Sequence, residues 1–279
     1  MPYILLIIYF ASSFLLQFLT GDFPATVLAF PLNLMLLLIW MISVAVLWQK
    51  GKKSSFVRFM LSPGASISAL GAFLAFCIAV GMTGWRWVVG TWPFVAFMLY
   101  FITVLAFVTL RGWRSASASG NLPGNVRWRF LFLHAGLLVA ACSAFWGAPD
   151  SKTLKVQAFK DVPVSEAISE DGRREWLDFE LALEDFCVSF GADGMPSDYE
   201  AIVAVNQERI TLRVNHPYSV SFGTDLYLSG YDTAYERYCI FQIVSEPWRY
   251  GAAAGIVMML TGAFMLFIGG PRRRINENK

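Results

Sequence analysis

The chain has 279 residues, of which 56% are hydrophobic and 16% aromatic, while only 15% are charged. Soluble globular domains carry about 25% charged residues, so this composition excludes an ordinary soluble domain. The formal net charge of +2 conceals a division, because residues 148–247 hold 18 of the 20 acidic residues and only eight basic ones. That acidic segment argues against nucleic acid as a partner.

Six runs contain no Asp, Glu, Lys or Arg, and each is about as long as a helix that crosses a bilayer. The runs are 3–19, 25–48, 65–83, 93–110, 130–147 and 251–270. No basic segment precedes the first run and no small-residue cleavage site precedes Gly21, so we expect an uncleaved helix and not a signal peptide. The sequence therefore predicts an integral membrane protein with six transmembrane α-helices in a lipid bilayer.

Lys and Arg residues concentrate in segments 50–58, 111–129 and 271–279. Short Lys/Arg-rich loops stay in the cytoplasm, and six alternating helices place all three segments on one side. Both termini are therefore expected to be cytoplasmic. Segment 111–129 is expected to be a flexible loop, because it is rich in Ser, Gly and Arg. Residues 56–61 are expected to form a short interfacial stretch.

The long polar segment is expected to fold as an extracytoplasmic antiparallel β domain. Alternating apolar and polar residues predict strands, which are separated by Gly, Pro, Asn and Asp clusters. These strands are 153–159, 176–190, 199–205, 209–215, 224–232 and 237–244. Their number and length favour a sandwich or a small barrel. Residues 162–175 are expected to form a loop or a short helix. Cys187 and Cys239 lie in this domain, and they could be a disulfide or two free thiols.

These patterns divide the chain into four parts. Residues 1–50 form an N-terminal transmembrane hairpin, and residues 51–147 hold helices three to five with their basic loops. Residues 148–248 are the extracytoplasmic β domain. Residues 249–279 are the last transmembrane helix and a basic cytoplasmic tail.

His134 is the only His, Asp, Glu, Lys or Arg in the six runs. A neutral imidazole in lipid needs partners for its ring nitrogens, so it should face the bundle or a cavity. One interpretation is axial ligation of a haem iron. A proton relay is less consistent with the sequence, since the runs hold no Asp or Glu. The structural alternative is an interhelical hydrogen bond to a hydroxyl or a backbone carbonyl.

Four other residues are weaker candidates for haem contacts. His216 precedes a proline at a strand end, where it is either a turn residue or a second haem ligand. Trp85, Trp87 and Trp92 cluster in the sequence GWRWVVGTW. They form either an aromatic belt at the membrane surface or a platform on which a porphyrin stacks. No nucleophile motif, zinc spacing or phosphate-binding loop is present, so we do not expect an enzyme.

From about residue 60 to 270 the sequence resembles the ResB-like family of System II cytochrome c biogenesis proteins. Its likeness lies in four stretches in the family's order: FLHAGLLVAACSAFWGAPD, DFELALEDFCVSF with GMPSDYEAIVAV, RVNHPYSVSFGTDLYLSGYD, and FQIVSEPWRYGAAAGIVMMLTGAFMLFI. The family core has four helices, with the exported domain between its third and fourth. These helices correspond to runs three to six, so the first hairpin is an addition to the core.

The resemblance implies haem handling in the bacterial inner membrane. Family members work with a CcsA/ResC-type membrane protein, carry haem b in transit and present it to apocytochrome c. Their membrane histidine, which corresponds to His134 here, is thought to ligate haem from the cytoplasmic side. A second ligand would come from the partner or from another copy. The alternative is a membrane assembly protein without haem, whose β domain scaffolds a complex. A small-molecule transporter is a weaker third possibility.

Overall fold

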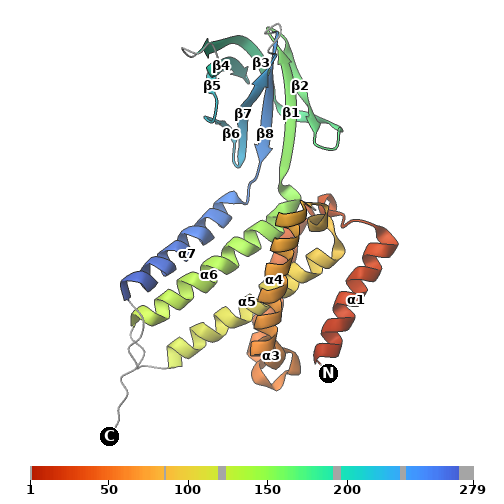
Figure 1. Cartoon of the computed structure of the whole chain (residues 1–279), viewed down its shortest axis with the longest axis vertical. Coiled ribbons are helices and arrows are strands. Elements are labelled where there is room, and N and C mark those ends of the chain that lie inside the picture. Colours follow the sequence, from red (N-terminus) through yellow and green to blue (C-terminus); the bar gives the residue numbers. More distant parts are fainter. Residues whose placement is uncertain (1, 85, 119–123, 191–195, 233–236, 270–279) are drawn as a thin grey trace. The chain divides into compact units, whose positions relative to one another are not determined.

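A computed structural model describes residues 2–84, 86–118, 124–190, 196–232 and 237–269. The contacts divide the chain into two compact units. One consists of Met1–Pro149 together with Arg249–Lys279, and the other of Asp150–Trp248. The first unit is helical and the second is built from strands (Figure 1).

The helical unit begins with two long helices and the short segments that join them. These are α1 (Pro2–Thr20), η1 (Ala25–Leu28), α2 (Leu32–Lys50), η2 (Gly51–Lys53) and α3 (Ser55–Met60). The remaining segments are α4 (Pro63–Thr83), η3 (Arg86–Gly90), α5 (Trp92–Ala118), α6 (Gly124–Gly147), η4 (Ala148–Asp150) and α7 (Arg249–Gly269). Local sequence sets the ends of α4: the Ser62 hydroxyl accepts from the Ala65 amide at 3.2 Å, and Gly84 ends the helix at a φ of 66°.

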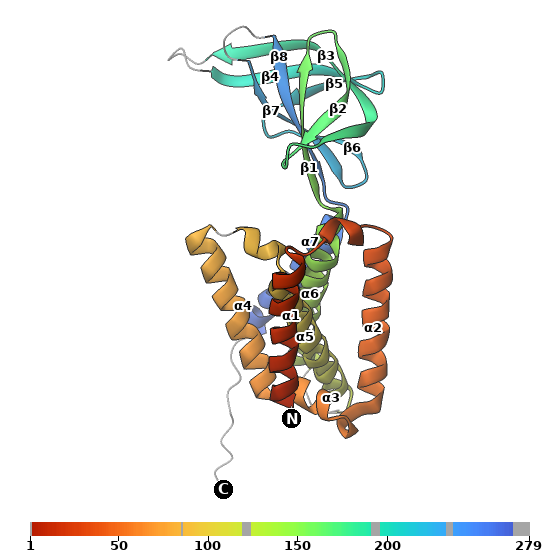
Figure 2. The same cartoon turned by 90° about the vertical axis from the view of Figure 1, so that its right-hand side faces the viewer.

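Six of these helices, α1, α2, α4, α5, α6 and α7, are long and apolar enough to cross a membrane. The helix α5 is central, since 56% of its apolar span is buried, compared with 6% for α1 and 11% for α4. Figure 2 shows α1, α2 and α4 arranged around α5 and α6. The outer helices therefore expose continuous apolar faces, as lipid-facing helices do.

The first two helices are attached to the others by polar contacts. From α1, the Tyr9 hydroxyl donates to the Ala96 carbonyl of α5 at 2.9 Å. From α2, Trp40 Nε1 donates to Thr103 Oγ1 of α5 at 3.0 Å. The Asn33 side chain is 1% exposed, and its Nδ2 donates to the Trp146 carbonyl of α6 at 2.9 Å. Such hydrogen bonds hold helices together in a bilayer, where the hydrophobic effect does not favour helix–helix contact over helix–lipid contact.

The charge-free run 25–48 contains the separate 3-10 turn η1 and then α2, which begins at Leu32. One sequence prediction about helix ends is wrong. Segment 111–129 was expected to be a loop, but α5 continues to Ala118 and α6 starts at Gly124. Arginine is a good helix former and its long side chain extends toward polar surroundings, so charge alone did not mark the helix ends. The short helix α3 matches the predicted stretch 56–61.

The β unit is one eight-stranded antiparallel sheet with the order β5-β4-β3-β2-β1-β8-β7-β6. Its strands are β1 (Lys152–Phe159), β2 (Pro163–Ser169), β3 (Arg174–Phe190), β4 (Pro196–Val205), β5 (Glu208–Arg213), β6 (Tyr218–Ser221), β7 (Thr224–Tyr231) and β8 (Tyr238–Ser245). Inward residues from strands across the sheet form a single apolar core. Within the described residues, the strand pairing leaves β5 and β6 as edges, so the sheet is open, and the expected sandwich or small barrel is confirmed only as an antiparallel sheet.

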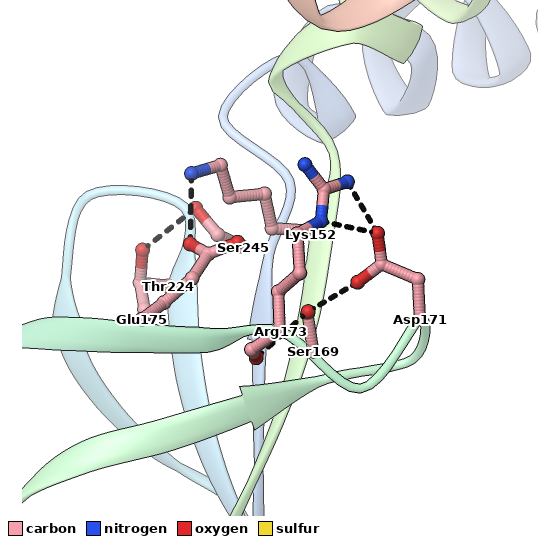
Figure 3. Close-up of polar contacts among 7 residues, drawn as sticks. All are labelled: Lys152, Ser169, Asp171, Arg173, Glu175, Thr224 and Ser245. Atoms are coloured by element: carbon pink, nitrogen blue, oxygen red, sulfur yellow. Dashed lines mark hydrogen bonds and ion pairs between the residues drawn. The ribbon is translucent and has the colours of Figure 1, made fainter.

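Residues 162–175 do not form the expected loop or helix. They contain β2 and the start of β3, which pair as a hairpin. Strand pairing makes residues 163–169 a strand, because the first half of the 17-residue β3 pairs with β2. At the turn, Arg173 and Ser169 both bond to Asp171 (Figure 3), and these contacts lower the pKa of Asp171 to about 2. The side chains of this ion pair are largely exposed, so it fastens the turn and adds little stability.

The four cysteines are free thiols. Cys239 lies in β8 with its side chain in the core, and burial raises its pKa to about 12. Cys187 lies in β3 and is exposed. The reactive form of a cysteine is its thiolate, so burial of Cys239 limits both its access and its ionisation.

We expect a membrane-impermeant maleimide, applied to intact cells near neutral pH, to label Cys187 and leave Cys239 unmodified. The chain used would carry Cys77→Ser and Cys142→Ser, and mass spectrometry would locate the label. Cys187→Ser should abolish labelling, whereas Cys239→Ser should leave it unchanged. Labelling of Cys187 only after cell lysis would place the β unit in the cytoplasm. Labelling of Cys239 in the folded chain would contradict its burial.

Candidate functional site

His134 lies on α6, and its ring is partly buried. Its Nδ1 is 3.0 Å from the carbonyl oxygen of Phe130, one helical turn earlier. A carbonyl oxygen only accepts, so Nδ1 carries the hydrogen, and in the neutral ring the lone pair is on Nε2. Among the described residues, Nε2 has no hydrogen-bond partner. Metal-binding histidines show this arrangement, with one ring nitrogen held by a carbonyl and the other available.

The Phe130 ring fixes the plane of the imidazole. The two rings stack with centroids 3.9 Å apart and an interplanar angle of 20°. Phe130 also packs against α5 at Gly112, where an added Cβ would lie 1.9 Å from Phe130 Cε1. A glycine on α5 therefore makes the space that lets Phe130 orient His134.

The face of α6 that carries His134 points into the bundle. Leu138, Ala141 and Phe145 follow His134 at four, seven and eleven residues, which places them on the same side of the helix. All three pack against the apolar core that surrounds α5. His134 thus lies at the α5–α6 side of the helix. Its hydrogen bond stays within α6, so it is not the interhelical bond that formed the structural alternative.

The opposite face of α6 forms a very close contact with α7. A Cβ added at Gly255 would lie 2.5 Å from the Ala140 amide nitrogen and 2.6 Å from the Gly136 carbonyl oxygen. A Cβ at Gly262 would lie 2.9 Å from the Leu133 amide nitrogen. Small residues at such spacing allow helix backbones to touch in membranes. The sequence carries one signal of this interface, the four-residue spacing of Gly251 and Gly255, which did not enter the predictions.

Trp87 and Trp92, two of the other predicted site residues, do not join His134. Trp92 bonds to α1, with its Nε1 donating to Thr20 Oγ1 at 3.0 Å and its ring edge-on to Phe23 at 4.8 Å. Gly112, beside Phe130, is 20 residues further along α5, which is about 30 Å at the rise of an α-helix. The Trp87 side chain is 64% exposed. Trp85 lies outside the described residues.

His216 belongs to the β unit and lies in the turn between β5 and β6. It is exposed, and its amide donates to the Arg213 carbonyl at 3.1 Å. The preceding Asn215 has a φ of 61°, as expected for a tight turn. The surroundings of His216 are those of a turn residue. Among the described residues, no group of three or more His, Cys, Asp or Glu side chains could hold a metal ion.

These features define a class of protein: an apolar six-helix unit with a histidine inside it and a separate polar β unit inserted before the last helix. Residues 124–237, which contain α6 and the first seven strands, match the model of the ResB-like family. The family resemblance is confirmed for this segment, which includes His134.

Comparison with solved structures gives a distant likeness to a protein titled Cytochrome c Heme Lyase CcmF. The TM-score is 0.43 and the sequence identity 12%, over 92% of this chain and 44% of that one. The chain thus spans less than half the length of that protein. No curated protein matches the sequence.

Proposed function

We propose that this chain acts in cytochrome c biogenesis, as the ResB-like subunit of a complex that brings haem across the membrane and presents it to apocytochrome c. The match of residues 124–237 to the family supports the role. The observation that carries the haem assignment is the geometry of His134, whose Nδ1 is held by the Phe130 carbonyl at 3.0 Å. That bond leaves the Nε2 lone pair available to ligate iron.

In this proposal haem b is cargo and not a resident cofactor. His134 supplies one axial ligand, and a CcsA/ResC-type partner or a second copy supplies the other. The stacked Phe130 keeps the imidazole from rotating, so the ligand is preorganised. In this proposal, Trp87 and Trp92 belong to the aromatic belt at the membrane surface. The chain binds and presents haem and forms no covalent bond to it.

The proposed topology follows from the basic segments. All three segments lie on the cytoplasmic side of a bacterial inner membrane, with both termini inside and residues 148–248 outside. Residues 1–50 are then a hairpin added to the family core. The acidic β unit would hold the partner or the apocytochrome near the point where haem leaves the membrane.

The test is the level of c-type cytochromes in cells that lack this chain. We expect their covalently bound haem, stained in denaturing gels, to fall to background and to return with the wild-type gene. The His134→Ala gene should restore little of it, although the variant accumulates in the membrane. Unchanged c-type cytochromes in the deletion strain would contradict the proposal and favour a scaffold for another complex.

A further inference from the structure

A cavity of about 380 Å³ lies between α1, α3 and α5. Its wall includes Leu6 of α1, Phe59 of α3 and Leu99 of α5. At its rim, Leu5 is 63% and Phe56 40% exposed, so the cavity opens to the surface of the helical unit. The volume is within the range of small-ligand sites.

The polar groups in the wall are already occupied by the protein. The Tyr9 hydroxyl donates to the Ala96 carbonyl at 2.9 Å, and the Tyr100 hydroxyl to the Ala65 carbonyl at 3.2 Å. Thr103 Oγ1 donates to the Leu99 carbonyl at 2.6 Å. These bonds leave an apolar lining that offers little to a polar ligand and suits a hydrocarbon chain.

Positive charge lies at both ends of α3, beside this cavity. Arg58 Nη2 donates to the hydroxyl of Ser55, which lines the cavity, at 3.1 Å. Arg111 Nη1 donates to the Leu61 carbonyl at 2.9 Å. Within the described part of the helical unit, the one acidic side chain before Asp150 is Asp22, near the far end of α1. No carboxylate in that part of the chain therefore neutralises these two guanidinium groups.

We propose that the α1–α3–α5 cavity binds one acyl chain of an anionic phospholipid, whose phosphate contacts Arg58 and Arg111. An apolar slot open to the surface requires hydrocarbon to fill it in a bilayer, and guanidinium groups bind phosphate by paired hydrogen bonds. Basic clusters beside membrane helices are sites of this kind. The bound lipid fastens the added hairpin to α5, since α1 and α5 both line the site. The proposal does not depend on haem handling.

Native mass spectrometry of the full chain, stripped of lipid in detergent, tests this. Phosphatidylglycerol and phosphatidylcholine with the same oleoyl chains are the two probes. We expect tighter binding of one phosphatidylglycerol per chain. Arg58→Gln and Arg111→Gln should each weaken it about fivefold, as expected for one cation near a lipid phosphate. The matched control is Arg249→Gln at the start of α7, the other end of the helical unit (Figure 1), which should have no effect.

A second variant tests the apolar part of the site. Leu99→Phe places a larger side chain in the cavity and leaves less room for an acyl chain, so it should lower the binding of both lipids. Size-exclusion chromatography verifies that the variant folds. The two arginine variants keep the test valid if Leu99→Phe does not fold. Equal binding of the two lipids, or arginine variants that match Arg249→Gln, would overturn the proposal. Haem absorbance that is lost in Leu99→Phe but kept in His134→Ala would show that the cavity holds haem and not lipid.

Discussion

Co-purified with the proposed CcsA/ResC-type partner, the wild-type chain is expected to show low-spin Soret and α bands, and His134→Ala is expected to lose them. In the proposed role His134 ligates the haem iron, so removing its imidazole would leave an open coordination position on that iron. Imidazole added to the buffer can enter the space left by the side chain and restore the bands. The readout is the absorption spectrum of the reduced complex, with and without imidazole.

The matched control is His216→Ala, which removes the chain's other histidine from an exposed turn. It should leave the spectrum unchanged. The imidazole rescue separates ligation from packing, because a histidine that only packs against Phe130 gives no spectral recovery. Equal spectra for wild type and His134→Ala would make His134 a packing residue. Loss of the bands in His216→Ala instead would move the ligand to the β unit.

Gly255→Ala is expected to destabilise the helical unit strongly. The new methyl group would lie 2.5 Å from the Ala140 amide nitrogen and 2.6 Å from the Gly136 carbonyl oxygen. Both are backbone atoms, so the helices must separate, and overpacking of this kind costs about 1–3 kcal/mol. The thermal midpoint of the detergent-solubilised chain should fall by several degrees, and the amount of protein in the membrane should fall with it.

Gly71→Ala in α4 is the matched control. A Cβ at Gly71 would meet no atom within 4 Å, so the same change there should have no cost or should slightly stabilise the helix. A loss of stability at Gly71 as large as that at Gly255 would show that helix flexibility matters, and not the close contact. An unchanged midpoint for Gly255→Ala would contradict the observed approach of α6 and α7.

His134 and the resemblance to the ResB-like family could be recognised from the sequence because both depend on residue identity and order alone. One ionisable side chain in six apolar runs is conspicuous. What the sequence could not supply is the pair of contacts that gives the histidine its geometry. The stack of Phe130 and the space at Gly112 join residues on two helices, and only their packing brings them together.

In the β unit, the sequence predicted some strands and missed others. Alternation identified six strands, since one face of each packs into a core. It did not identify β2, because Val164 and Ala167 are too few inward residues to outweigh the polar ones around them. The short β6 was missed for the same reason. Register and sheet order decide such segments, and these depend on partners far along the chain.

The sequence by itself determined the six apolar helices, the separate acidic β segment and the one histidine inside the apolar runs. Periodicity, length and charge are local properties, and each of these features depends on them. The tertiary structure alone decided which face of α6 meets α5 and which meets α7, that the sheet stays open over the described residues, and that Trp87 and Trp92 do not join His134. Those outcomes depend on close contacts between distant residues, and no local pattern specifies them.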